Sequence, residues 1–185
     1  MLGISPAFAS DTISIEFGEV DTENQVVEIL YDNPGQIYGF KFFVLGIDIT
    51  NVYGGDAEAY NFFLNQNSTC WRDDDCKDEV EGFTYTGTPI PPGSGILFYI
   101  NYAETGDEIF DDNIQVDDQT CLDITEGYFF GMESDGTPGN FIVETGSCAD
   151  SPIDCNGNFY GPSSVDDCGV CDGGNADMDC AGNCN

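Results

Sequence analysis

The stretch Gly39-Phe40-Lys41-Phe42-Phe43-Val44-Leu45 decides the fold class of this chain. Successive side chains of a strand point to opposite faces of a sheet, and here both alternating sets are largely apolar. A strand with two apolar faces is typical of the interior of a sheet that is covered on both sides. We therefore expect this stretch to be a central strand of a layered β structure.

Further strand-like segments lie on both sides of this stretch, and Gly, Pro, Asn and Asp residues separate them. This pattern predicts an all-β protein whose residues 12–148 form an antiparallel β-sandwich, after an N-terminal segment of residues 1–11. The one short helix is expected within residues 56–64. The clearest strands are expected at residues 12–17, 26–31, 37–49, 82–85, 95–102, 127–132 and 141–145.

The charge of the chain restricts its partners. Its 185 residues include 35 acidic side chains against Lys41, Arg72 and Lys77, which gives a net charge of −32. Phosphate recognition needs Lys and Arg, so nucleic acids and anionic membranes are excluded as partners. Self-repulsion at this charge favours bound cations, and carboxylates in this number suit Ca²⁺. A solvated acidic surface of the halophilic kind is the alternative. No apolar run approaches the roughly 20 residues of a membrane-spanning helix.

Nine cysteines and no histidine indicate an oxidising compartment and a disulfide framework. We therefore expect a secreted protein at an extracellular, cell-surface or virion-surface location. Cys70 with Cys76 and Cys121 with Cys148 are the expected pairs of the sandwich, and Cys184 is the candidate for the cysteine left over. The disulfide candidates are Cys70, Cys76, Cys121, Cys148, Cys155, Cys168, Cys171, Cys180 and Cys184.

Residues 149–185 have a different composition, in which Cys, Gly, Asp and Asn dominate and large apolar residues almost vanish. Such a tail cannot build a core, so we expect cross-links and metal to hold it. It also contains a repeat, because Asp154-Cys155-Asn156-Gly157-Asn158 recurs as Asp179-Cys180-Ala181-Gly182-Asn183.

Oxygen-bearing side chains at alternate positions of the tail predict two calcium loops, because Ca²⁺ takes several converging oxygen ligands. The Tyr160 and Ala181 carbonyls would supplement the side chains. Asx turns capped by water are one alternative. A zinc site is another, because Cys168-x2-Cys171 and Cys180-x3-Cys184 have suitable spacing. The predicted calcium ligands are Asp154, Asn156, Asn158, Tyr160, Asp166, Asp167, Asp172, Asn175, Asp177, Asp179, Ala181 and Asn183.

Two family resemblances accompany these patterns. The run 15–53, with its Gly54-Gly55 loop, followed by Pro89-Ile90-Pro91-Pro92-Gly93-Ser94-Gly95-Ile96-Leu97, resembles cohesin-type sandwich domains of secreted bacterial proteins. That resemblance implies recognition of a protein partner, or a role as a spacer, adhesin or pilin-like subunit. Asp166-Asp167-Cys168-Gly169-Val170-Cys171-Asp172 resembles thrombospondin type 3 repeats, which implies calcium binding in the tail.

The function expected from the sequence is structural rather than catalytic. The chain lacks histidine, the commonest general base, and no Ser or Cys has a recognisable activating partner. The leading hypothesis is a calcium- and disulfide-stabilised adhesive surface protein, as a filament subunit or a module of a larger repeat protein. It would bind itself or another surface protein, and residues 12–17 would add to a neighbour's sheet.

The alternative hypothesis is a calcium-dependent module that binds a carbohydrate or a protein. Aromatic side chains are its motivation, because exposed rings can form a flat binding platform. The residues expected in that platform are Tyr53, Tyr60, Phe62, Phe63 and Trp71.

Overall fold

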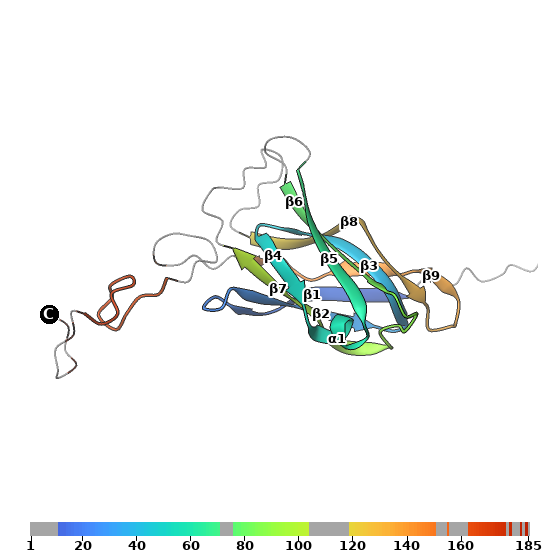
Figure 1. The fold of residues 1–185 in the computed structure, drawn as a ribbon, viewed down its shortest axis with the longest axis horizontal. Coiled ribbons are helices and arrows are strands. Elements are labelled where there is room, and N and C mark those ends of the chain that lie inside the picture. The colour runs from blue at the N-terminus through green and yellow to red at the C-terminus, as the bar shows by residue number, and fades with distance from the viewer. Residues whose placement is uncertain are drawn as a thin grey trace, which may run out of the picture.

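The computed structural model describes residues 11–70, 76–103, 119–150, 155, 163–176, 178, 182 and 184. Its strands form two sheets that pack face to face (Figure 1), so the predicted all-β sandwich is confirmed. Sheet A contains, in spatial order, β10 (Ile142–Thr145), β1 (Thr12–Asp21), β2 (Val26–Asn33), β7 (Gly93–Ala103) and β4 (Asp48–Tyr53). Sheet B contains β11 (Ala149–Asp150), β8 (Gln119–Met132), β3 (Gln36–Leu45), β6 (Cys76–Thr84) and β5 (Phe62–Cys70), and β9 (Pro138–Asn140) pairs with β8.

A stack of phenylalanine rings forms the centre of the core. Phe40 and Phe42 project from the same face of β3, and Phe98 projects toward them from β7 of the opposite sheet. The ring centroid of Phe98 lies 5.7 Å from that of Phe40 and 5.9 Å from that of Phe42. All three side chains are fully buried, so the stack joins the two layers.

The Phe40 ring needs a glycine on the neighbouring strand. Gly82 of β6 lies opposite Phe40, and a methyl group added at Gly82 would lie only 2.2 Å from Cζ of Phe40. A side chain at position 82 would therefore displace the central ring, which explains a glycine inside this strand.

Residues 37–49, expected as one strand, form two strands in different sheets. β3 ends at Leu45 in sheet B, and β4 begins at Asp48 in sheet A. Gly46 between them has a φ of 90°, a backbone conformation that glycine adopts without steric cost. The prediction was wrong because Ile47 and Ile49 are buried too, so the apolar pattern continues through the turn.

The helix α1 is shorter than expected and spans only Gly55–Ala59. It begins one residue before the range in which a short helix was predicted, residues 56–64, and otherwise lies within it; Phe62 already belongs to β5 and packs in the core. In sheet A, β1 lies between β2 and β10, and its pairing with β10 is parallel. β1 is thus an interior strand, with Ser14 and Ile15 paired on both sides, so the idea that this strand is free to extend a neighbour's sheet was wrong.

Side chains from sheet B form hydrogen bonds with the backbone of the edge strand β4 at Ile49. The amide N–H of Ile49 donates to Asp78 on β6, and the Ile49 carbonyl accepts a bond from Nε2 of Gln66 on β5 at 3.2 Å. Asp78 is only 7% exposed, so these bonds form in a largely dry environment. They tie one edge of the sandwich together and occupy backbone groups that would otherwise be open to another strand.

We predict that Asp78→Ala lowers the free energy of unfolding by about 1–3 kcal/mol, because it leaves the Ile49 N–H without its buried acceptor. Urea unfolding followed by fluorescence measures this change. Asp32→Ala, which removes an exposed carboxylate from β2, is the matched control and should have little effect. Equal stability of the two variants would contradict the proposed role of Asp78.

Candidate functional site

Three aromatic side chains form a partly exposed ring cluster on the outer face of sheet B. Phe63 of β5 and Phe83 of β6 are directly opposite each other, with ring centroids 5.4 Å apart, and Tyr85 follows the end of β6. The Tyr85 ring lies 5.0 Å from that of Phe83 and 5.5 Å from that of Phe63. Phe63 is 43% exposed and Tyr85 is 70% exposed, so this cluster presents apolar surface to solvent.

The apolar surface continues across the sheet to Phe130. Phe83 pairs with Gly39 of β3, which pairs in turn with Phe130 of β8. A methyl group at Gly39 would lie 2.4 Å from Cε1 of Phe130, so the Phe130 ring covers this glycine. Beside the ring is a hollow of about 460 Å³, lined by Tyr38, Phe130, Gly131, Met132, Pro138, Gly139 and Asn140.

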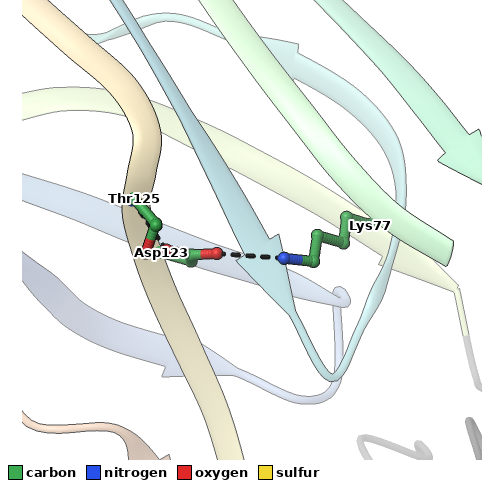
Figure 2. Close-up of polar contacts among 3 residues, drawn as sticks. All are labelled: Lys77, Asp123 and Thr125. Atoms are coloured by element: carbon green, nitrogen blue, oxygen red, sulfur yellow. Dashed lines mark hydrogen bonds and ion pairs between the residues drawn. The ribbon is translucent and has the colours of Figure 1, made fainter. Parts of the chain in front are cut away.

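The other half of the same face carries two lysines, and both are held by carboxylates. Nζ of Lys41 lies 2.6 Å from Glu79, and Nζ of Lys77 lies 3.2 Å from Asp123 (Figure 2). Phe43 lies beneath them, with the two ammonium groups 5.3 and 5.9 Å from its ring centroid. Although Phe43 points away from the core, it is only 5% exposed. The lysines therefore cover the second apolar face of β3 that the sequence predicted.

A bulge in β8 brings Asp123 to this position. The register of β8 against β3 shifts between Asp123 and Tyr128, and the Asp123 carboxylate accepts a 2.8 Å bond from the Thr125 N–H (Figure 2). Burial alone would raise the pKa of Asp123, but the hydrogen bonds from Thr125 and the ion pair with Lys77 outweigh it and lower that pKa. The carboxylate is thus ionised at neutral pH.

We predict that this ion pair makes stability depend on acidity at low pH. Because the pKa of Asp123 is lowered in the folded state, its contribution is present at neutral pH and is lost as the pH falls below its ordinary value of 3.8. Thermal unfolding between neutral pH and strongly acidic pH measures the effect. Asp123→Asn should unfold at a lower temperature than the native chain at neutral pH, and the difference should shrink in acid. A difference that is independent of pH would show that the charge is unimportant.

The aromatic platform expected from the sequence is not assembled in the structure. Tyr53 stacks on Tyr99 in sheet A, at 5.6 Å, whereas Phe62 is in the core and Tyr60 packs against it. Only Phe63 lies on the outer face of sheet B, and Trp71 is outside the described residues. The actual cluster includes Phe83 and Tyr85, which the sequence reasoning missed. The alternation of apolar residues at 82–85 indicated these two side chains, but the strand register was needed to show that they lie beside Phe63.

Disulfides cross-link the C-terminal part of the chain. Cys121 is bonded to Cys148, the pair expected from the sequence. The other two described disulfides join Cys155 to Cys171 and Cys168 to Cys184. The assignment of Cys184 as the cysteine left over was therefore wrong, because spacing alone did not reveal that it bonds to the preceding turn.

These disulfides also rule out the zinc site that the cysteine spacing allowed. Three of the four cysteines of that site, Cys168, Cys171 and Cys184, are in disulfides and are not available as thiolates. Cys171 and its partner Cys155 lie near Asp172, but for the same reason this group does not offer a thiolate site. In the sandwich, Cys70 and Cys76 pair directly across β5 and β6, and their side chains are outside the described residues.

The described calcium-ligand candidates bond mainly to nearby donors. The Asp166 carboxylate accepts bonds from the N–H groups of Cys168, Val170 and Asn175, at 2.9, 3.0 and 2.8 Å. These bonds, chiefly that from Val170, lower the pKa of Asp166. Asp167 exchanges bonds with Asn175, and Asp172 accepts bonds from Ser163 and Ser164.

These contacts are those of Asx-type turns, and they do not gather the carboxylates of the described tail around one point. Calcium binding therefore stays a prediction. The remaining calcium-ligand candidates lie outside the described residues, namely Asp154, Asn156, Asn158, Tyr160, Asp177, Asp179, Ala181 and Asn183. The disulfide candidate Cys180 also lies outside them.

Comparison with solved structures finds distant likenesses, among them two cohesin structures. A non-cellulosomal cohesin from the hyperthermophilic archaeon Archaeoglobus fulgidus has 14% identity and a TM-score of 0.45, over 72% of this chain and 86% of that one. A chain of a cohesin–dockerin complex at pH 5.5 has 12% identity and a TM-score of 0.41, over 71% and 94%. Both TM-scores are low, so these likenesses carry no argument about function. No family model and no curated protein matches the chain.

Proposed function

We propose that this chain is an extracellular adhesive or protein-binding module, and that it docks another protein on the outer face of sheet B. The supporting observation is the apolar strip from the ring cluster of Phe63, Phe83 and Tyr85 to Phe130. Large exposed aromatic side chains that lie together on a protein surface are typical of protein-binding sites. We call this strip the docking face.

The ion pairs beside the strip support the same proposal. Lys41 and Lys77 are both paired with carboxylates, so two of the carboxylates on this half of the face are neutralised in a chain that carries a charge of −32. A partner thus needs to desolvate fewer unpaired charges here. We propose binding rather than catalysis for this face.

The cross-links support a location outside the cytoplasm. The described residues contain three disulfides, and such bonds persist mainly in oxidising compartments. No helix in the described part of the chain is long and apolar enough to span a membrane. We propose that the protein is secreted or displayed at a cell or virion surface, as a module of a larger assembly.

The docking face can be tested without knowledge of the natural partner. A phage-displayed library of random peptides is selected on the oxidised chain, because such libraries enrich for ligands of binding hot spots. The selected peptides are then measured against the double variant Phe63→Ser/Tyr85→Ser. We expect most of them to bind this variant at least about tenfold more weakly.

The matched control for this test is Tyr53→Ser, which removes a similarly exposed ring from sheet A. It should leave the affinity of the selected peptides unchanged. Peptides that lose affinity for Tyr53→Ser but keep it for the double variant would place the binding site on the other sheet. A mixed glycan array measures the carbohydrate alternative, and glycan binding that needs Phe63 would favour it.

We further propose that calcium stabilises the tail through the loop from Asp154 to Tyr160. What supports this is the alternate spacing of oxygen ligands in that loop and the strong excess of carboxylates in the chain. In such a tail, the cation would stabilise the folded form by binding to it, whereas the disulfides limit the unfolded ensemble.

We predict that excess Ca²⁺ stabilises the oxidised chain and that chelation reverses the effect. A site saturated at about 100 times its Kd contributes about 2.7 kcal/mol, which thermal unfolding resolves. Asp154→Ser/Asn156→Ser should remove the response. Asp32→Ser, which removes an exposed sandwich carboxylate, should retain it. If Ca²⁺ and chelator give the same unfolding curve, the acidic turns are not calcium sites. Light scattering in the same samples measures any calcium-dependent self-association.

A further inference from the structure

The hollow beside Phe130 has one carboxylate on the same face of the sheet. The ring of Tyr128 lies 6.3 Å from that of Phe130, and the Tyr128 hydroxyl donates a 3.0 Å bond to Glu81. The Glu133 carboxylate, by contrast, accepts a 3.3 Å bond from the Asp11 N–H, just before β1 of sheet A. Beyond the apolar hollow, the outer face therefore carries the Glu81 carboxylate.

Lys41 lies opposite Glu81 in the sheet, but its ammonium group is bonded to Glu79, and the other lysine of the described residues, Lys77, is paired with Asp123. Burial, together with the neighbouring Glu81 carboxylate, also raises the pKa of Tyr128, so this hydroxyl stays a neutral donor. With a net charge of −32, the chain favours a ligand that brings positive charge.

The lining of the hollow specifies the remaining chemistry. Tyr38, Phe130, Met132 and Pro138 contribute mostly apolar atoms, and a volume of about 460 Å³ accommodates one large side chain. The flexible thioether of Met132 adapts to different apolar shapes. A second copy of this chain is a poor occupant, because each copy would bring a charge of −32 to the contact.

We propose that the docking face binds a positively charged polypeptide, which places one large apolar side chain in the hollow and Lys or Arg beside Glu81. This inference rests on the proposed function and names the chemistry of its partner. The apolar anchor supplies most of the affinity, whereas the charges favour basic partners over others.

The test uses four short fluorescein-labelled peptides, with binding measured by fluorescence anisotropy. The first is rich in Lys and Ser with a central Trp, and the second has Ser in place of the Trp. The third has Ser in place of every Lys, and the fourth has Glu there. We expect the Lys and Trp peptide to bind at least about tenfold more tightly than each of the others. No binding of that peptide at millimolar concentration would overturn the proposal.

Variants of the protein locate the binding site. Phe130→Ala removes a wall of the hollow, and Asn140→Trp fills it from its exposed rim. Each variant should abolish the advantage of Trp over Ser in the peptide. The second variant guards against a folding defect in the first, and thermal unfolding verifies both. An advantage of Trp that survives in folded forms of both variants would show that the anchor binds elsewhere.

Charge variants separate specific contacts from general attraction to an acidic protein. Glu81→Gln keeps an acceptor oxygen and removes the charge, and it should weaken binding of the Lys peptide about threefold. Glu144→Gln removes one exposed charge from β10 of sheet A and should have a smaller effect. Equal effects of the two variants would overturn the basic-partner assignment.

Failure of this proposal is distinguishable from failure of the docking face. If the library-selected peptides depend on Phe63 and Tyr85 but are not basic, the face is correct and its partner chemistry is wrong. If their binding is insensitive to the face altogether, the proposed function itself fails.

Discussion

The stack of Phe40 and Phe42 on Phe98 is the interaction on which the sandwich depends. It joins sheet B to sheet A near the middle of both, and all three side chains are fully buried. Burial of such a side chain contributes about 1.5–3 kcal/mol. Because β3 lies between β8 and β6, its register also sets the position of their outward side chains. The outer face of sheet B is therefore a consequence of how the core packs.

The sequence alone predicted the class of fold and most of its strands, because apolar alternation directly reflects burial. It did not predict the change of sheet at Gly46, since Ile47 and Ile49 continue the apolar pattern into the next strand. The binding face was predicted only in part. Phe63 was identified, but Phe83 and Phe130 join it through strand pairing between distant segments, which a local pattern does not specify.

The strong negative charge and the apolar strip are compatible because the few cations are well placed. Lys41 and Lys77 both lie on the outer face of sheet B, where they neutralise carboxylates and shield Phe43 from water. Surface ion pairs contribute little stability, typically about 0–1 kcal/mol. Their larger effect here is on recognition, because they neutralise two carboxylates beside the apolar strip, while the net negative charge of the chain repels other acidic proteins.

The tail replaces a core with covalent bonds arranged in a regular series. The bridges Val165–Cys171 and Met178–Cys184 are 13 positions apart (178 − 165 and 184 − 171), and the disulfides ending at Cys171 and Cys184 both span 16 residues. In the sequence the same period separates Cys155 from Cys168 and Cys171 from Cys184, but it is interrupted because the position 13 residues after Cys168 is an alanine. Each disulfide joins one 13-residue unit to the next, so neighbouring units are held together with little buried apolar surface. The tail therefore keeps its form only where disulfides persist, which links its architecture to an oxidising environment.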